Sequence, residues 1–368
     1  MNARVAAMLV ALLVLMGGGA LQFYQQSKSK KPAGAGTLGQ PLLMGLQAAE
    51  IASIVIREPK AAITLERKDA GWAIAERGGF PADVERVREF ALKAIELKIG
   101  QSEPIAAAER ARLKVDDSGT GVEFKGADGK MLARILVGKK YFKSEPDDPD
   151  KAIGDGRFVL LPENAQTVYV VSNPLAQASA KTAEWIARTG FAVEKVKTLE
   201  VSPASGDGWK IERAADNAEW KLSGAKTNQK LEMTKANAAA YSLSSVELAD
   251  VAPKDAKAEE TGLAKPALVT AATFDGLVYT LKVGRLEGDR YYATVALAGE
   301  PKPEGGDAAE RAKKIAERLP RERALADYTL LIAKSKLEDI LKPRADLLAK
   351  KKDGAKKKSE NPPRRAPK

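Results

Sequence analysis

Apolar and polar residues alternate along two stretches of the chain that resemble each other. The first, Ile63 to Ala75, reads ITLERKDAGWAIA, with alternating residues, a polar turn, and a second alternating run that opens on Trp72. The second, Trp209 to Leu222, reads WKIERAADNAEWKL and has the same order. A period of two is typical of a half-buried β-strand. Each stretch therefore predicts a strand, a turn and a second strand, and the recurrence predicts two related halves.

The first half, from about Ile51 to Ala187, contains further strand and helix patterns. Asp83 suits a helix N-terminus, and the residues after it place apolar side chains on one helical face, namely Val84, Val87, Phe90, Ala91, Ala94 and Ile95. Strands are expected at residues 51–56, 121–124, 132–137, 158–161 and 167–171. Gly138 is expected to end the third of these, and a second helix is predicted over Leu175 to Ala187.

The second half repeats these landmarks in the same order, mostly at offsets of roughly 145 to 150 residues. The matched pairs include Leu199 with Ile54, Val201 with Ile56, Trp220 with Trp72, Thr234 with Asp83 as a helix start, Tyr241 with Phe90, Gly284 with Gly138, Arg290–Tyr291 with Arg157–Phe158, and a final strand and helix ending near Leu348. We therefore expect an α+β protein of two tandem, duplicated, mainly antiparallel β-sheet domains with flanking helices.

One segment breaks the match between the halves. Residues 301–326 include the charged run AERAKKIAERL, where the first half offers only the acidic loop 145–155. Because this helix is polar nearly all round, we expect a solvated excursion from the second domain.

The N-terminus carries a membrane signal. Val5 to Phe23 is a run of 19 uncharged residues, close to the length of about 20 that spans a bilayer. It predicts a transmembrane signal anchor, and the alternative is a cleaved signal peptide with Gly18 and Ala20 before the cut. The expected organisation is an anchor over 1–26, a flexible linker over 27–48, α+β repeats over 49–190 and 191–349, and a disordered basic tail over 350–368.

Charge and composition narrow the function classes. The formal net charge is +11, but most of it lies in the tail and beside the N-terminal segment, so no nucleic-acid partner is expected. The chain has no Cys and no His, which excludes disulfides, thiolate nucleophiles and the histidine base of a serine triad. The flanking charges favour a cytoplasmic body slightly, whereas a short N-terminal apolar segment favours export. We expect a single-pass inner-membrane protein with a periplasmic body.

A turn motif in the second half carries a family resemblance. Thr261 to Pro266 reads TGLAKP and is followed by a strand to Phe274, an Asp275–Gly276 turn, and a strand ending Val283–Gly284. Glycine permits a left-handed turn and proline starts an extended segment. Together with the N-terminal segment, these features resemble the bacterial domain of unknown function 4340. The resemblance covers most of Ile51 to Leu348, although the first half departs from it at Arg112–Leu113, where no Gly or Pro completes the turn.

The resemblance implies a place and no mechanism. Members of that family look like envelope proteins, and they accompany ABC-type export systems similar to those of gliding motility. The membrane and the permease and ATPase subunits of such a system are therefore the expected partners. The resemblance supplies no catalytic residue for this chain.

Four motifs have residue types that could carry chemistry. Ser223 to Lys226 fits the Ser-x-x-Lys pattern of a nucleophile, but its companion motifs are absent. Gly126 to Lys130 fits a hairpin turn better than a phosphate loop. An acidic loop could bind Ca²⁺ or lie solvated, through Glu145, Asp147, Asp148, Asp150 and Asp155. Three tryptophans could form a sugar platform or pack in the core, namely Trp72, Trp209 and Trp220. No catalytic, cofactor-binding or metal-binding residue is predicted.

The leading expectation is a non-enzymatic, membrane-anchored envelope accessory or scaffold protein that is an auxiliary component of an ABC-type transport system. The first alternative is a periplasmic binding module for polysaccharide or peptide, in a cleft between the halves. The second is a Ser–Lys hydrolase acting through Ser223.

Overall fold

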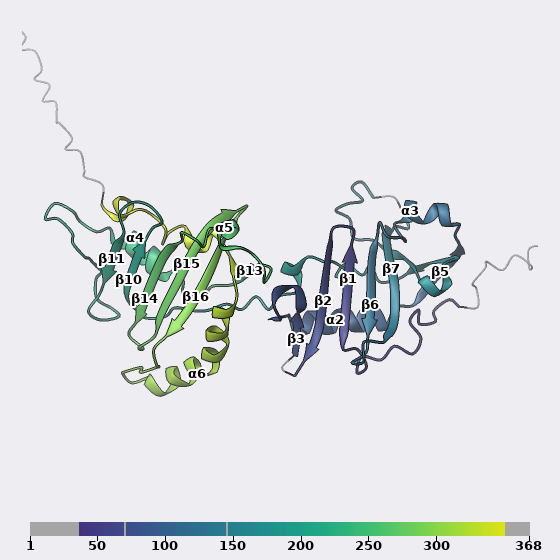
Figure 1. Ribbon diagram of the computed structural model, residues 1–368, viewed down its shortest axis with the longest axis horizontal. Helices are drawn as coiled ribbons and strands as arrows, with labels where there is room; N and C mark the ends of the chain where they lie inside the picture. The colour runs from purple at the N-terminus through teal and green to yellow at the C-terminus, as the bar shows by residue number, and fades with distance from the viewer. Residues whose placement is uncertain (1–36, 70, 145, 350–368) are drawn as a thin grey trace, which may run out of the picture. The chain divides into compact units, whose positions relative to one another are not determined.

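The computed structural model describes residues 37–69, 71–144 and 146–349, which form two compact units divided between Arg188 and Thr189. Each unit is built on an antiparallel β-sheet with a few helices, so the fold is α+β (Figure 1). The predicted anchor at Val5 to Phe23 and the predicted tail over 350–368 lie outside the described residues. Across the part of the chain that is described, no helix has the length and apolar character needed to cross a membrane.

The first unit contains a nine-stranded sheet. Its strands, in spatial order, are β4 (Phe80–Pro81), β3 (Gly71–Ile74), β2 (Ala61–Lys68), β1 (Ser53–Glu58), β6 (Thr120–Lys125), β7 (Met131–Tyr141), β8 (Gly156–Leu160), β9 (Thr167–Val171) and β5 (Ile99–Pro104). Its α-helices are α2 (Val84–Ile95) and the single turn α3 (Arg110–Leu113), and its short 3₁₀ turns are η1 (Ala75–Arg77), η2 (Ala107–Glu109), η3 (Pro162–Asn164) and η4 (Thr182–Glu184).

The second unit contains an eight-stranded sheet. Its spatial order is β12 (Lys221–Leu222), β11 (Trp209–Glu212), β10 (Val196–Ser202), β14 (Ala267–Thr273), β15 (Val278–Glu287), β16 (Arg290–Ala298), β17 (Leu330–Ala333) and β13 (Leu248–Val251). Its helices are α4 (Met233–Tyr241), α5 (Ala258–Thr261), α6 (Ala308–Ala324) and α7 (Lys334–Leu337), with 3₁₀ turns η5 (Leu325–Asp327) and η6 (Arg344–Leu347).

The two sheets share one strand order. If β3 is matched with β12, each following neighbour also matches in chain order, down to β5 and β13 at the far edge. Along the chain, α2 precedes the edge strand β5, and α4 precedes the edge strand β13. Likewise α3 precedes β6, which pairs with β1, and α5 precedes β14, which pairs with β10. The predicted hairpins are therefore present in both units, and the spatial strand order that the two sheets share is a finding of the structure.

The alternating pattern at Ile63 places its apolar residues in the core as predicted. Ile63 pairs with Ile56 and Leu65 pairs with Ile54, and all four side chains are buried. Thr64 and Glu66, on the opposite face, are only partly covered. The hydrophobic effect therefore fixes the register, since a slip of one residue would turn the buried face outward.

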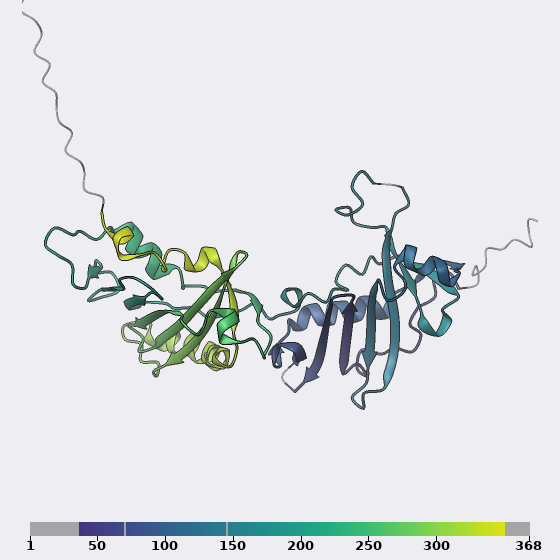
Figure 2. The same ribbon diagram turned by 45° about the horizontal axis from the view of Figure 1, so that its top comes forward.

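Helix α2 starts where the sequence predicts. The Asp83 carboxylate accepts a hydrogen bond from the Arg86 amide at 3.1 Å, which caps the helix. Phe90 points into the core, where its ring stacks on Phe124 of β6 and meets the edge of Trp185. Figure 2 shows α2 covering one face of the first sheet.

The matching helix of the second unit starts earlier than predicted. Its N-cap is Glu232, not Thr234, and no side chain caps it. This shifts the correspondence, because Ala239 is buried where Phe90 is buried and Tyr241 is 49% exposed. Tyr241 was therefore wrongly matched to the core, and alanines pack this helix closely on its sheet.

The predicted helix over Leu175 to Ala187 is wrong. Only the short turn η4 is helical, although most of the segment is buried. Leu175 has a left-handed φ of 46°, and its amide donates to the Asn173 side chain. The Trp185 indole donates to the Ser179 carbonyl, and Ile186 bridges to Ala82. These contacts replace the helical hydrogen bonds.

Residues 37–48 are not the flexible linker that the sequence predicts. Leu42, Leu43 and Leu46 are buried. The amide of Leu42 donates to the Leu97 carbonyl, and Pro41 bridges to Lys98. The apolar leucines fasten this segment to the first unit, so the folded region begins before Ile51.

Two further boundaries and one correspondence between the halves differ from the prediction. Strand β7 continues through Gly138 to Tyr141, because an irregular register there keeps the pairing with β8. The final helix before Leu348 consists only of the short α7 and η6, separated by Pro343, which cannot continue a helix. The α6 insertion joins β16 to β17, so its counterpart is the link between β8 and β9 and not the acidic loop, which joins β7 to β8.

Candidate functional site

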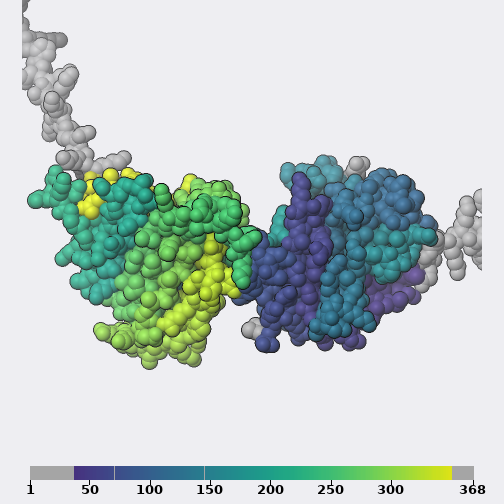
Figure 3. Space-filling view, in the orientation of Figure 1, coloured from purple at the N-terminus to yellow at the C-terminus, as the bar shows by residue number. Residues whose placement is uncertain are grey.

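Helix α6 is the largest difference between the two units, and it is not a solvated excursion. Arg311, Ile315, Leu319 and Glu322 follow one another at spacings of four, four and three, and Arg318 comes four residues before Glu322, which places all five on one helical face. Ile315, Leu319 and Glu322 are buried. In the space-filling view, the α6 region packs directly against the strands of its unit (Figure 3). The prediction of a helix polar all round was wrong, because two apolar residues and a charged stripe suffice to dock it.

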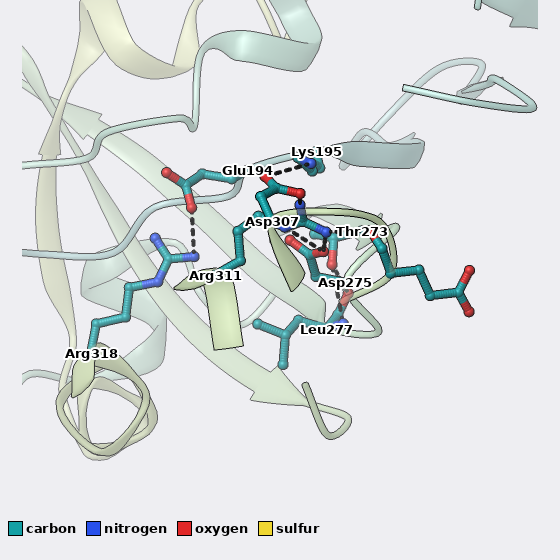
Figure 4. Close-up of polar contacts among 9 residues, drawn as sticks. Glu194, Lys195, Thr273, Asp275, Leu277, Asp307, Arg311 and Arg318 are labelled. Carbon is teal, nitrogen blue, oxygen red and sulfur yellow. Dashed lines mark hydrogen bonds and ion pairs between the residues drawn. The ribbon is translucent and has the colours of Figure 1, made fainter. Parts of the chain in front are cut away.

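The first contact of this stripe joins Arg311 to Asp275, which lies in the turn between β14 and β15 (Figure 4). The Asp275 carboxylate is 4% exposed, and Arg311 approaches it at 3.2 Å through Nη2 and at 3.3 Å through Nε. The same guanidinium donates to Asp307 and to the Glu304 carbonyl. Asp275 is therefore buried as one half of an ion pair that holds the start of α6.

The turn that carries Asp275 is fixed by its neighbours. The Thr273 hydroxyl bonds both the amide and the carbonyl of Leu277, at 3.1 and 3.2 Å. Gly276 has a left-handed φ of 86°, and a Cβ there would lie 2.7 Å from the Glu300 carbonyl oxygen. The Asp275–Gly276 turn thus contacts the chain that leads into α6, which explains why glycine is required there.

The second contact is centred on Glu322, near the end of α6. Its carboxylate is 2% exposed and accepts hydrogen bonds from the Tyr279 hydroxyl at 2.7 Å and the Ala192 amide at 3.1 Å. Arg318, one turn earlier, lies 3.6 Å from Glu322 and 3.2 Å from Glu194. Three elements distant in sequence therefore meet at one buried carboxylate.

The contacts in this network shift the pKa of two of its groups. Burial, together with the hydrogen bond to Glu322, raises the pKa of the Tyr279 hydroxyl well above its ordinary value. The hydrogen bond from Arg311 lowers the pKa of Asp307. Both shifts favour the protonation states that the contacts need, namely a neutral tyrosine and an ionised aspartate.

The chemistry open to this network is limited by its own contacts. Two buried carboxylates with a tyrosine nearby are an arrangement that can perform acid–base catalysis. Here Asp275 is engaged by Arg311, and Glu322 is engaged by Tyr279 and Ala192. The network, which we call the α6 seam, therefore binds α6 to the second sheet, and both buried carboxylates take part in that contact.

The Ser223 motif lies in a turn after β12. Ser223 is half-buried, and its carbonyl oxygen accepts a hydrogen bond from Arg344. Lys226 is exposed, and its amide donates to the Gln229 side chain. A depression of about 640 Å³ lies beside this turn, lined in part by Lys226 and Arg344. Within the described residues, no hydrogen bond joins the Ser223 hydroxyl to the Lys226 amine.

Two of the three tryptophans that could form a sugar platform are core residues. Trp209 and Trp220 are each 3% exposed, and their indole nitrogens donate to the Lys342 carbonyl and to the Asn237 side chain. The buried Arg213 guanidinium lies 4.5 Å from the centre of the Trp220 ring. Trp72 is half-buried. The structure therefore supports core packing for Trp209 and Trp220 and not a sugar-binding platform, because both side chains are buried.

The acidic loop uses its charges within the loop. Asp148 accepts hydrogen bonds from the amides of Asp150 and Lys151, and Asp155 accepts one from the amide of Lys143. The Lys140 ammonium donates to three loop carbonyls, those of Pro149, Asp150 and Ala152. Glu145 lies outside the described residues. Over the described ranges, no group of carboxylates has the arrangement of a metal site.

The glycine-rich stretch after β6 is the predicted hairpin turn. Gly129 has a left-handed φ of 78°, and the Gly126 amide donates to the Lys130 carbonyl across the turn. The Asp128 carboxylate accepts a hydrogen bond from the Lys130 amide. This geometry is that of a turn between β6 and β7.

Sequence reasoning missed the α6 seam, although its signal was present. The spacing of Arg311, Ile315, Arg318, Leu319 and Glu322 marks one face of a helix. Their low apolar content hid that face, because three of the five are charged. The partners Asp275 and Tyr279 come from a distant hairpin, which no local pattern reveals.

A protein-family model matches part of the chain. Residues 72–266 match the family model described as Domain of unknown function (DUF4340). No curated protein and no solved structure matches the chain. The matched residues make up more than half of the chain and run from β3 of the first unit to the TGLAKP turn of the second. The chain therefore belongs to the DUF4340 family.

Proposed function

We propose that this protein is a non-enzymatic, membrane-anchored accessory or scaffold protein of the cell envelope. One observation carries the non-enzymatic part. The side chains that most resemble an active site, Asp275, Tyr279 and Glu322, are engaged in contacts that dock α6. Charged groups used in this way hold a fold together, as expected for a protein that acts through its shape and its partners.

The tether is supported by the N-terminal sequence. The 19 uncharged residues from Val5 to Phe23 match the length of a membrane span. Leu42, Leu43 and Leu46 are packed on the first unit, so the chain between the proposed anchor and the folded body is short. A body held so close to the membrane suits a protein that works beside a membrane complex. The same segment directs the body to the periplasm in this proposal.

A duplication accounts for the two units. The strand order is the same in both sheets, and glycines at Gly138 and Gly284 make the same contact with the turn before them. We propose that both units descend from one ancestral domain and that α6 was added to the second. Two similar sheets on one tether offer two related surfaces, which favours a scaffold that contacts more than one subunit.

The partner class follows from the family resemblance, which implies an ABC-type transport system. Co-purification from gently solubilised membranes, with an affinity tag after Lys368, tests this proposal. We expect an ATPase and a permease to be recovered with the full-length chain and to be absent when an untagged strain is processed in parallel. Recovery of the chain without either subunit, after chemical cross-linking in cells, would contradict the transport role.

The Ser–Lys hydrolase keeps a separate test. Replacing Ser223 by Ala removes the only hydroxyl of that motif without disturbing the Arg344 contact, which uses the backbone carbonyl. We expect Ser223→Ala to leave the cellular phenotype of the protein unchanged. Loss of function in a variant with normal thermal stability would favour the hydrolase instead.

A further inference from the structure

A pocket at one end of the first sheet gathers three cationic side chains. Its volume is about 420 Å³, and its lining includes Lys60, Lys114 and Arg157 against one carboxylate, Glu58. The lining comes from the turn between β1 and β2, the turn after α3, and the start of β8. Figure 1 shows the end of β1 and α3 at the same end of this sheet. Three positive groups and one negative group leave the pocket with two excess positive charges.

Arg157 is the pocket's cation with the least access to water. Its side chain is half-buried, and within the described residues it makes no hydrogen bond or ion pair. Its Nε atom is buried with no acceptor. Desolvation lowers the pKa of the guanidinium, which records the cost of holding this charge away from water. A half-buried cation without an acceptor is costly to a fold, and a bound anion would offset that cost.

The second unit shows that the fold does not require these cations. Val137 pairs with Val159, and Val283 pairs with Ala293, so the two registers align Arg157 with Tyr291. This corrects the expected match of Arg157 with Arg290. The turn after α3 places Lys114 in a left-handed conformation, where the turn after α5 has Gly262. The same architecture is therefore built with a tyrosine and a glycine in place of the two cations.

Backbone hydrogen bonds hold the turn that carries Lys114. The Val115 amide donates to the Arg110 carbonyl, and the Gly119 amide donates to the Asp116 carbonyl. The Asp116 carboxylate is occupied by the amide and hydroxyl of Ser118, which lower its pKa. The Asp116 carboxylate therefore accepts its hydrogen bonds from within the turn. Among the described residues, neither Lys60 nor Lys114 forms an ion pair.

We propose that this pocket binds a phosphate group through Arg157, Lys114 and Lys60. A guanidinium offers paired donors that fit phosphate oxygens, and ammonium groups add charge. The volume of about 420 Å³ leaves room for a phosphate group that is part of a larger molecule. A phospholipid headgroup and a soluble phosphorylated compound share this chemistry. The site goes beyond the proposed accessory role, because it assigns a ligand to the first unit.

Isothermal titration calorimetry on the purified full-length chain, in a non-ionic detergent and about 0.15 M salt, tests the site. The two probes are inorganic phosphate and dihexanoyl phosphatidylglycerol, which has a phosphodiester headgroup and is soluble. Three variants accompany the wild-type chain. Arg157→Gln removes the unpaired guanidinium, Lys114→Gly removes a cation while relieving its left-handed backbone, and Arg57→Gln removes an exposed charge from the neighbouring strand β1.

We expect saturable binding of at least one probe, weakened about tenfold or more by Arg157→Gln. Lys114→Gly weakens binding without a loss of thermal stability, and Arg57→Gln matches the wild type. Binding of inorganic phosphate alone assigns the site to a soluble ligand, and tighter binding of the lipid assigns it to a headgroup. Absence of saturable binding of both probes, or equal affinities in the wild type and Arg157→Gln, would overturn the proposal. Because every variant retains the basic tail, a loss of binding in Arg157→Gln but not in Arg57→Gln assigns the binding to the pocket and not to the tail.

Discussion

Gly284 touches the backbone of Thr261 so closely that no other residue fits there. A Cβ at Gly284 would lie 2.2 Å from the Thr261 carbonyl oxygen. In the first unit, a Cβ at Gly138 would lie 2.3 Å from the Leu113 carbonyl oxygen. The strand and the turn before it are therefore fastened in the same way in both units. This contact gives a physical reason for the glycine that ends the motif of the family resemblance.

Replacing Gly284 by Ala should destabilise the protein strongly. The added methyl group must displace the backbone of the turn after α5, at a cost of about 3 kcal/mol or more. Gly306→Ala is the matched control, because a Cβ at Gly306 meets nothing within 4 Å. Thermal unfolding of both variants measures the difference. Equal melting temperatures for the two would contradict the close contact.

Lys114 and Gly262 occupy equivalent left-handed positions, with φ of 55° and 74°. Lys114→Gly should stabilise the protein by about 1 kcal/mol, because glycine adopts this conformation without strain. Gly262→Ala should destabilise it, since its Cβ would also lie 2.5 Å from the Arg285 amide nitrogen. Chemical denaturation measures both. Shifts of the same sign would show that the two turns are not equivalent.

Glu322 is the residue on which the docking of α6 most depends. Glu322→Ala leaves the Tyr279 hydroxyl and the Ala192 amide buried without their acceptor and should cost about 3 kcal/mol. Glu310→Ala, which breaks only the exposed pair with Lys314 on the same helix, should have little effect. Hydrogen exchange should show early opening of α6 in Glu322→Ala alone. Normal protection of α6 in that variant would contradict a structural role for the seam.

Tyr279 should make the second unit sensitive to alkali. Its pKa is raised in the folded chain, so its contribution is fully present below the unfolded tyrosine pKa of about 10 and is lost as the pH rises further. Tyr279→Phe removes this titration. The stability difference between the wild type and Tyr279→Phe should therefore shrink above about pH 10, by up to about 1.4 kcal/mol per pH unit. Chemical denaturation at each pH measures this stability difference. A constant difference across this range would argue against a buried neutral tyrosine.

The local pattern of the sequence predicts much of the fold. Alternation at Ile63 and Leu65 identifies a strand, and Asp83 identifies the start of α2, because each signal depends on residues within one or two turns. The repeated landmarks also predict that the two halves contain similar elements in the same order along the chain. The edge strands β5 and β13 were missed, since the Ile99–Pro104 segment is mostly exposed and shows no clear alternation.

What the sequence could not predict depends on distant partners. The segment at Leu175 folds without a helix because Trp185 finds the Ser179 carbonyl and Ile186 finds Ala82. The seam under α6 exists because Asp275 and Tyr279 come from another hairpin. The candidate phosphate pocket likewise collects residues from three separate turns and strands, so its charges are dispersed along the sequence.

We propose that the chain is a membrane-tethered component of the envelope. Extraction of isolated membranes with alkaline carbonate tests it most directly, with the full-length chain compared to a variant that begins at Ser27. We predict that the full-length chain stays in the membrane pellet, that the shortened variant is released, and that protease added outside the inner membrane digests the body. Release of the full-length chain by carbonate would contradict the anchor, and protection of its body from that protease would contradict the periplasmic placement.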